Sequence, residues 1–163
     1  MGLWHLLFGF SGRIHRAKYW LGVVLWALAG LLAFGIILNV TWHAISAYSA
    51  DNTGGFIANL GLGIVLCVVV GIPTLISGCA IGVKRLHDRN RSGWWILVFY
   101  FGPSVLNLID RLADSAVLSF VLQLAIVVVA VWGLVELGFL RGTVGPNQYG
   151  PDPLAPAQVP AMR

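Results

Sequence analysis

The sequence KRLHDRNRSGWW, at Lys84–Trp95, is the most densely charged stretch of a chain that is otherwise mostly apolar. Four of its first eight residues are Lys or Arg, and it ends in two tryptophans. Apolar segments flank it on both sides. This pattern is typical of a charged loop at a membrane surface, in which the aromatic pair marks the point where the chain re-enters the lipid.

The composition indicates a membrane protein. Of the 163 residues, 58% are hydrophobic and only 10% are charged, whereas soluble domains carry about 25% charged residues. So few charges cannot cover a surface that faces water, so lipid must be the main solvent. The formal net charge is +4. The basic residues cluster beside apolar segments, where they report orientation and contact with anionic lipid, so we expect no nucleic-acid partner.

The hydropathy pattern predicts an all-α membrane protein with four transmembrane helices in one domain, residues 1–153. The predicted spans are about residues 19–40, 56–83, 94–109 and 115–140. As a helix, the first would be about 33 Å long, which is enough for a bilayer core of about 30 Å. Residues 154–163 are rich in Pro and Ala, and we expect a disordered C-terminal tail there.

Two of the predicted spans are irregular. The second contains Pro73, which removes one helix hydrogen bond, so we expect it to tilt or kink. The third contains Gly102 and Pro103 and would be only about 24 Å long as a straight helix. We expect it to cross the bilayer as a kinked helix, and a re-entrant segment is the alternative.

The distribution of basic residues predicts the orientation. With four spans, one side of the membrane would hold nine of the ten Lys and Arg residues: Arg13, Arg16, Lys18, Lys84, Arg85, Arg89, Arg91, Arg141 and Arg163. The other side would hold only Arg111, together with a loop containing Asp51 and Asn52. By the positive-inside rule, both termini and the Lys84–Trp95 stretch are expected in the cytoplasm.

Three local patterns coincide along the chain. They are FSGRIHRAKYW at Phe10–Trp20, KRLHDRNRSGWW at Lys84–Trp95 and GTVGPNQYGPDP at Gly142–Pro153. Together they resemble the small bacterial inner-membrane proteins grouped as domain of unknown function 805. The resemblance implies a multi-pass helical protein of the bacterial inner (plasma) membrane with about four spans, and it leaves the activity open. Gln148 stands where the family commonly has a basic residue, which weakens any claim that the tail binds phosphate.

The three motifs lie on the same predicted side, so their polar residues are candidates for one site. The candidates are Arg13, Arg16, Lys84, Arg85, His87, Asp88, Arg89, Arg91, Asn147 and Tyr149. Two interpretations stay open. The residues could form a structural motif in which the cations follow the positive-inside rule and snorkel to the interface. Alternatively, their guanidinium groups could bind a lipid head group or another anionic ligand.

Catalytic, metal-binding and cofactor-binding residues are not predicted. His87 and Asp88 are adjacent, so on a helix they would point about 100° apart and would not chelate one ion. Ser92 has no orienting acid at a convincing place and no GxSxG elbow around it. The sequence therefore favours a protein without enzymatic activity. An enzyme acting on lipid head groups would require Asp88, His87 and Ser92 to converge on an open cleft.

Two polar residues lie inside the fourth predicted span. Glu136 is about one turn from the cytoplasmic end, and we expect an ion pair with Lys84, Arg85 or Arg141 rather than a proton relay. Gln123 lies nearer the middle of the membrane, and we expect it to form a hydrogen bond between helices.

These features lead to two function hypotheses. The first is a non-enzymatic scaffold or accessory protein whose basic cytoplasmic face binds anionic membrane lipids or a membrane protein partner. The alternative is a subunit of a small transporter or channel, which would need homo-oligomerisation because one chain this small can line only a short path.

Overall fold

The structure, a computed structural model, describes residues 2–46, 53–113 and 115–155. Over these residues the chain is helical and contains no β-strand. It forms two units: unit 1 comprises residues 1–20 and 79–163, and unit 2 comprises residues 21–78. The expected outer loop at Asp51 and Asn52 and residues 156–163 of the expected disordered tail lie outside the described residues.

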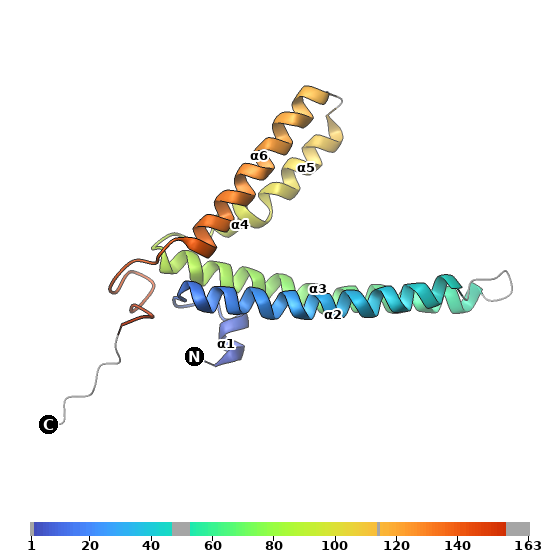
Figure 1. Ribbon diagram of the computed structural model, residues 1–163, viewed down its shortest axis with the longest axis horizontal. Coiled ribbons are helices and arrows are strands. Elements are labelled where there is room, and N and C mark those ends of the chain that lie inside the picture. The colour runs from blue at the N-terminus through green and yellow to red at the C-terminus, as the bar shows by residue number, and fades with distance from the viewer. Residues whose placement is uncertain (1, 47–52, 114, 156–163) are drawn as a thin grey trace. The chain divides into compact units, whose positions relative to one another are not determined.

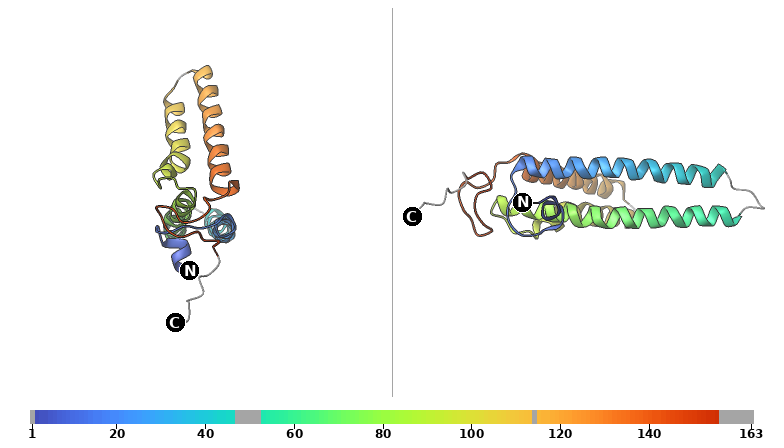
Figure 2. Two further views of the ribbon diagram at one scale, coloured as in Figure 1. Left: turned by 90° about the vertical axis from the view of Figure 1, so that its left-hand side faces the viewer. Right: turned by 90° about the horizontal axis from the view of Figure 1, so that it is seen from below.

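Unit 2 is a helical hairpin. It contains the greater part of α2 (Arg16–Ser46) and of α3 (Thr53–Asp88), which run antiparallel (Figures 1 and 2). A hydrogen bond of 2.6 Å from Trp26 Nε1 to Ser77 Oγ joins the two helices. α3 continues through Pro73 as one helix. Most of the large apolar side chains of this unit are exposed, as expected for helices whose solvent is lipid.

The helices of unit 1 form a second hairpin. α4 (Trp95–Tyr100) leads into α5 (Gly102–Leu112), and α6 (Ala116–Leu134) runs back along them and ends in the π-helix η2 (Val135–Phe139) (Figure 1). A short helix, α1 (Leu3–Phe8), begins the chain. Aromatic side chains pack together at one end of the hairpin, where the ring centroids of Phe99 and Trp132 lie 5.1 Å apart. At the other end, Gln123 donates a 2.8 Å hydrogen bond to Asp110, so the predicted bond between helices is confirmed.

Three helices of the described chain are long and apolar enough to cross a membrane: Arg16–His43, Ile57–Asp88 and Ala116–Phe139. They correspond to the first, second and fourth predicted spans. The third predicted span, residues 94–109, is instead divided into α4 and α5. Pro103 has no N–H to donate and Gly102 is a weak helix former, so the helix is interrupted at this point. The expected kink therefore takes the form of a break between two short helices.

The interpretation of Lys84–Trp95 as a loop is wrong for its first half. Lys84–Asp88 form the last turn of α3. The helix stops two residues later, where Asn90 has a φ of 56°. The Arg91 N–H then bonds to the Leu86 carbonyl at 2.9 Å and the Asn90 N–H to the His87 carbonyl at 3.0 Å. This is a Schellman motif with Asn in its left-handed position, which Asn tolerates better than other non-glycine residues.

Candidate functional site

Asp88 lies at the centre of the polar end of unit 1. Its Oδ1 accepts a 3.2 Å hydrogen bond from Arg13 Nε, and its Oδ2 accepts a 2.5 Å hydrogen bond from Arg85 Nη1. The side chains of Arg13, Arg85 and Asp88 are 1%, 0% and 4% exposed. A carboxylate at the C-terminus of a helix is opposed by the helix dipole. The two guanidinium groups compensate for this placement and for the loss of water.

Arg85 also holds the end of η2. Its Nε donates to the Leu137 carbonyl at 2.8 Å, and its Nη2 donates to the Leu140 carbonyl. Trp20 Nε1 donates to the neighbouring Gly138 carbonyl at 3.1 Å. The last carbonyls of a helix have no partner within the helix, and a cation is favourable beside them. Arg85 and Trp20 therefore satisfy a buried helix end that would otherwise be costly.

Lys84 performs the same task for α1. Its Nζ donates to the carbonyl oxygens of His5 at 2.8 Å and Leu6 at 2.5 Å. The residue is 0% exposed. A buried ammonium needs such acceptors, because without them its desolvation would cost several kcal/mol or more. Lys84 is thus a structural cation that fixes the first helix against α3.

Arg13 folds the tail motif around its guanidinium group. Nη1 donates to the carbonyls of Gly145 at 2.7 Å and Gly150 at 3.3 Å, and Nη2 donates to the Thr143 carbonyl at 2.6 Å. Gly145 and Gly150 have φ values of 79° and 136°, which glycine adopts without steric cost. The two glycines allow the tail to turn so that several carbonyls point at one side chain.

The tail in turn caps the C-terminus of α3. The Thr143 N–H donates to the Asp88 carbonyl at 2.8 Å, and Asn147 Nδ2 donates to the His87 carbonyl at 2.9 Å. Gly142 lies against Asp88 so closely that a Cβ there would overlap the carboxylate. The tail motif therefore needs a glycine at this position, and the Asn147 side chain completes the cap five residues later.

His87 and Tyr149 form a stacked pair beside this cap. Their ring centroids are 3.9 Å apart and their planes are tilted by 5°. Asn147 Oδ1 accepts a 2.9 Å hydrogen bond from the Tyr149 N–H, which orients the turn that presents the tyrosine. His87 Nδ1 is buried and has no hydrogen-bond partner among the described residues.

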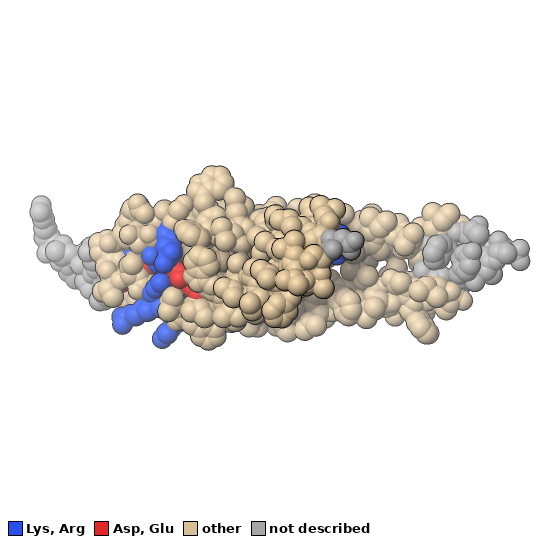
Figure 3. Space-filling view, turned by 90° about the horizontal axis from the view of Figure 1, so that it is seen from above, with Lys and Arg blue, Asp and Glu red and all other residues tan. Residues whose placement is uncertain are grey.

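Glu136 forms a second ion-pair cluster. One carboxylate oxygen, Oε1, lies 3.1 Å from Arg89 Nε and 2.8 Å from Arg91 Nε. The expected partners Lys84, Arg85 and Arg141 are wrong, because Lys84 and Arg85 point at helix carbonyls instead. The Glu136 side chain is 3% exposed, whereas those of Arg89 and Arg91 are 23% and 41% exposed. In Figure 3, blue basic and red acidic atoms lie beside each other on a surface that is otherwise mostly tan.

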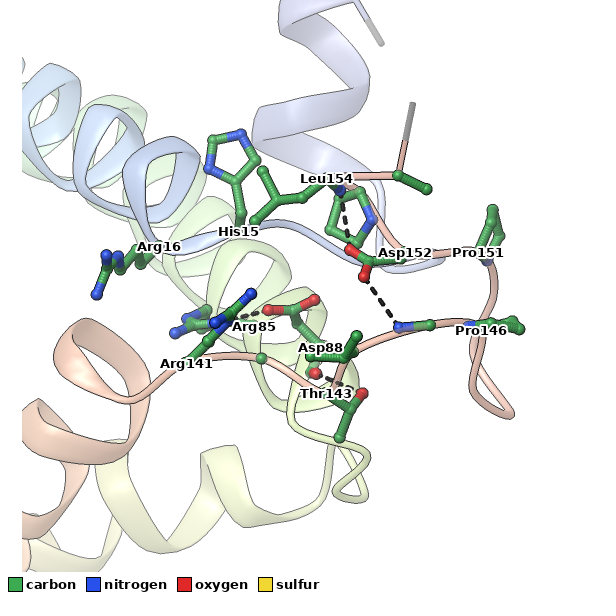
Figure 4. A pocket seen from close by; sticks show the side chains of 15 residues that line it. His15, Arg16, Arg85, Asp88, Arg141, Thr143, Pro146, Pro151, Asp152 and Leu154 are labelled. Carbon is green, nitrogen blue, oxygen red and sulfur yellow. Dashed lines mark hydrogen bonds and ion pairs between the residues drawn. The ribbon is translucent and has the colours of Figure 1, made fainter. Parts of the chain in front are cut away.

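A cavity of about 760 Å³ adjoins the Asp88 cluster. It is lined by His15, Arg16, Arg85, Asp88, Arg141, Gly142, Thr143, Val144, Gly145, Pro146 and residues 151–155 (Figure 4). The pKa of His15 is lowered, first by burial and then by the positive charge of Lys18. Among the described residues there is no group of three His, Cys, Asp or Glu side chains that could hold a metal ion.

A different pocket, of about 530 Å³, contains His87, Ser92 and Tyr149. Asp88 lines the first cavity and not this one. The convergence of Asp88, His87 and Ser92 that a membrane enzyme would require is therefore absent from these two pockets. Ser92 has a local contact instead, because its Oγ accepts from the Trp94 N–H at 3.4 Å, as expected for a turn before the next helix.

The ten candidates occupy five separate places in the structure. Arg13, Arg85, Asp88 and Asn147 meet around the end of α3; His87 stacks on Tyr149; Arg89 and Arg91 bind Glu136; Lys84 holds α1 and Arg16 lies at the cavity. Sequence reasoning missed Thr143 and His15. The position of Thr143 directly after Gly142, at the start of the tail motif, was the available signal.

Asp88→Asn should lower the free energy of unfolding by about 3–5 kcal/mol, because it leaves two buried guanidinium groups without an anion. Glu136→Gln should cost less, about 1–2 kcal/mol, because its partners are partly exposed to water. Reversible unfolding in mixed SDS micelles, followed by tryptophan fluorescence, measures both. Equal losses in the two variants would contradict the central role of Asp88.

The turn at Asp152 should loosen only in acid. The N–H groups of Leu154 and Gly145 donate to its carboxylate at 2.9 and 3.0 Å, and they hold its pKa below the usual 3.8. A lowered folded-state pKa means that the stabilisation is complete above the usual pKa and is lost as the pH falls through the lowered one. Hydrogen-exchange protection of these two amides should therefore stay constant above about pH 5 and fall below about pH 4. Asp152→Asn should remove this pH dependence, and an unchanged profile in that variant would assign the effect to another group.

Comparisons with known proteins agree with the three motifs. A family described as "Protein of unknown function (DUF805)" matches residues 7–151. The chain is 32% identical over 152 residues to the uncharacterised protein YiiR of Escherichia coli (strain K12), with 90% of this chain and 86% of that protein covered. It is 26% identical over 145 residues to the inner membrane protein YhaH of the same organism, with 89% and 87% covered. It is 29% identical over 148 residues to the inner membrane protein YhaI of that organism, with 89% and 86% covered.

No solved structure matches the chain. The family match extends over nearly all of unit 1 and all of unit 2, so it includes both ion-pair clusters and the tail cap. Together with the long apolar helices, the relatives named as inner membrane proteins identify a membrane protein with transmembrane helices. The chain belongs to the DUF805 family, whose function is unknown.

Proposed function

We propose that this protein is a multi-pass protein of the bacterial inner membrane with four spans and with both termini in the cytoplasm. Two relatives are named as inner membrane proteins. The charge distribution supports the orientation, because eight basic residues of the described chain lie in the N-terminal segment, at the end of α3 and at the start of the tail, whereas Arg111 lies at the far end of α5.

The packing of α4 and α5 supports a fourth span. The ring of Trp95 meets that of Trp132 with centroids 5.3 Å apart, and Asp110 bonds to Gln123. α5 then ends at Leu112, shortly before α6 begins at Ala116. The two short helices thus follow α6 from Ala116 to Trp132, a length of about 24 Å. A broken segment that accompanies a spanning helix over this length crosses most of the bilayer core of about 30 Å.

Cysteine labelling tests this topology. In a variant without Cys67 and Cys79, Leu112→Cys should react with a membrane-impermeant maleimide in intact spheroplasts, because it lies at the exposed far end of α5. Gln148→Cys, in the exposed tail, should react only after lysis. Labelling of Leu112→Cys only after lysis would show that α4 and α5 do not cross, and labelling of Gln148→Cys in intact cells would reverse the orientation.

The accessory role that the geometry supports best is binding of anionic lipid by the basic cytoplasmic face, without enzymatic activity. The observation that carries this proposal is the excess of positive charge that remains after the basic side chains have paired with carboxylates inside the protein. Arg13 and Arg85 share Asp88, and Arg89 and Arg91 share Glu136. Within the described chain, no ion pair involves the other cations of this end, Arg16, Lys18, Lys84 and Arg141, and only Lys84 is held by carbonyls. Each free cation near an anionic surface contributes about 1 kcal/mol of attraction.

The same contacts give less support to a proton-coupled transporter. That hypothesis needs Glu136 or Gln123 to face a path for solutes. Glu136 is buried against two arginines, and Gln123 binds Asp110 on the neighbouring helix. Both side chains therefore have the kind of partner that stabilises helix packing. A membrane protein partner for the basic face stays the alternative occupant.

The lipid hypothesis is tested by native mass spectrometry of the protein released from nanodiscs of mixed phosphatidylglycerol and phosphatidylcholine. The wild-type protein should retain phosphatidylglycerol preferentially, and the triple variant Arg16→Gln, Lys18→Gln, Arg141→Gln should lose most of this preference. Arg111→Gln, at the far end of α5, removes one charge from the other face and should leave it unchanged. Equal retention of the two lipids by the wild-type protein would refute the lipid role.

A further inference from the structure

The cavity beside Asp88 has two unlike walls. One wall carries charge and comes from the start of α2, the end of α3 and Arg141. The other is the folded tail, which contributes Val144, Leu154 and prolines together with one charged residue, Asp152, and Figure 4 labels Leu154, Pro146, Pro151 and Asp152 on this wall. Its volume of about 760 Å³ falls within the range of about 300–1,000 Å³ that small-ligand sites occupy. Such a site suits a ligand that has a charged part and an apolar or neutral part.

The acids at this cavity are already occupied. Both oxygens of Asp88 accept hydrogen bonds from guanidinium groups, one from Arg13 and one from Arg85. Both oxygens of Asp152 accept backbone hydrogen bonds, from the N–H groups of Leu154 and Gly145. Carboxylates that are satisfied in this way have little capacity left to attract a cation. Because its pKa is lowered, Asp152 also stays ionised at neutral pH and contributes one negative charge to the cavity.

The basic side chains leave a positive excess. Arg16, Arg85 and Arg141 line the cavity, and Arg13 donates to Asp88, so four guanidinium groups accompany the two carboxylates Asp88 and Asp152. Arg13 and Arg85 are committed to Asp88 and to backbone carbonyls. The described chain contains no ion pair for Arg16 or Arg141, and both residues line the cavity. Arg141 also acts on Asp152 through its charge. Guanidinium groups bind phosphate through paired hydrogen bonds.

The cavity also lies close to the expected membrane surface. Arg16 is the first residue of α2, which is long and apolar enough to span from that residue onward. Arg141 follows η2 by two residues, directly after the other spanning helix ends at Phe139. Both arginines therefore stand where a membrane-spanning helix leaves the hydrocarbon region, which is the depth of lipid phosphates.

From these observations we infer that the cavity between Arg16, Arg141 and the tail is a binding site for one phosphate monoester or diester anion. The inference rests on the proposed lipid-binding role and narrows it to one pocket, with a defined stoichiometry of one. Arg16 and Arg141 hold the phosphate oxygens, and the tail wall contacts the remainder of the ligand. The phosphate belongs either to a lipid head group or to a soluble phosphate ester.

Two kinds of variant distinguish binding in the cavity from a general attraction of anionic lipid to the basic face. Arg16→Gln with Arg141→Gln removes the proposed ligating charges. Val144→Trp keeps every charge and adds bulk to the cavity wall, because Val144 lines the cavity, and its 78% exposure leaves room for the larger ring. Val117→Trp is the matched control, since Val117 is 76% exposed and lies at the start of α6, away from the cavity. None of the four side chains takes part in the Asp88 or Glu136 ion pairs.

Binding is measured with two probes on the full-length protein in nanodiscs. Phosphatidylglycerol retention is counted by native mass spectrometry, and inorganic phosphate binding to protein in phosphatidylcholine nanodiscs is followed by phosphorus NMR. Each arginine lost should weaken binding about 5-fold, and the double variant about 25-fold. Val144→Trp should abolish the single retained phosphate ligand, and Val117→Trp should match the wild-type protein.

The outcomes distinguish the two proposals and the two phosphate sources. A Val144→Trp effect on lipid retention alone identifies a lipid head group, and an effect on inorganic phosphate as well identifies a site that also accepts a soluble phosphate. If the arginine variants weaken lipid retention and Val144→Trp does not, the pocket is refuted and the diffuse lipid-binding role stands. If inorganic phosphate binds in a Val144-sensitive way without any preference for phosphatidylglycerol, the pocket stands and the lipid role falls.

Discussion

Asp88 is buried between Arg13 and Arg85, and the other polar contacts at this end of unit 1 depend on that arrangement. Removing a carboxylate from water costs several kcal/mol, and the cost is offset only when both oxygens find charged donors. The two donors come from different segments, one before α2 and one on α3. Their remaining N–H groups reach the tail and the end of η2. One ionised side chain therefore fixes three segments that are far apart in the sequence.

A second constraint explains why so many cations are buried here. Three helix C-termini meet at this end of the unit, those of α1, α3 and η2, and each leaves carbonyls without partners. Lys84 satisfies α1, Arg85 and Trp20 satisfy η2, and Thr143 and Asn147 satisfy α3. Side chains with positive charge suit helix C-termini because of the dipole. The density of Lys and Arg in the Lys84–Trp95 stretch is therefore partly a consequence of helix geometry.

The sequence was sufficient for the long helices, because their apolar runs leave no alternative to a spanning helix. For the three motifs it offered only candidate residues for one site. It was not sufficient for Lys84 and Arg85, which hydropathy places in a loop although they are fully buried in α3. Their burial depends on carbonyls of α1 and η2, and these acceptors are distant in the sequence. The partners of Glu136 were missed for the same reason: once Lys84 and Arg85 are engaged elsewhere, Arg89 and Arg91 are the cations that remain within reach. The break between α4 and α5 was signalled by Gly102 and Pro103, but its form depends on packing against α6.

The basic residues have two interpretations, as signals of membrane orientation and as ligand-binding groups. The first applies to all of them during membrane insertion, and the second applies only to those left unpaired in the folded protein. Every Lys and Arg counts toward orientation while the chain inserts, since the tertiary pairs have not yet formed. After folding, Arg13, Lys84, Arg85, Arg89 and Arg91 are engaged by carboxylates or carbonyls, which leaves Arg16, Lys18 and Arg141 among the described cations of this face. A count of nine basic residues therefore overstates the charge that a ligand can meet. Two of the three remaining cations border one cavity, so the residual positive charge is localised rather than spread over the face. A localised charge beside apolar side chains can select one ligand, whereas a diffuse charge only attracts an anionic surface.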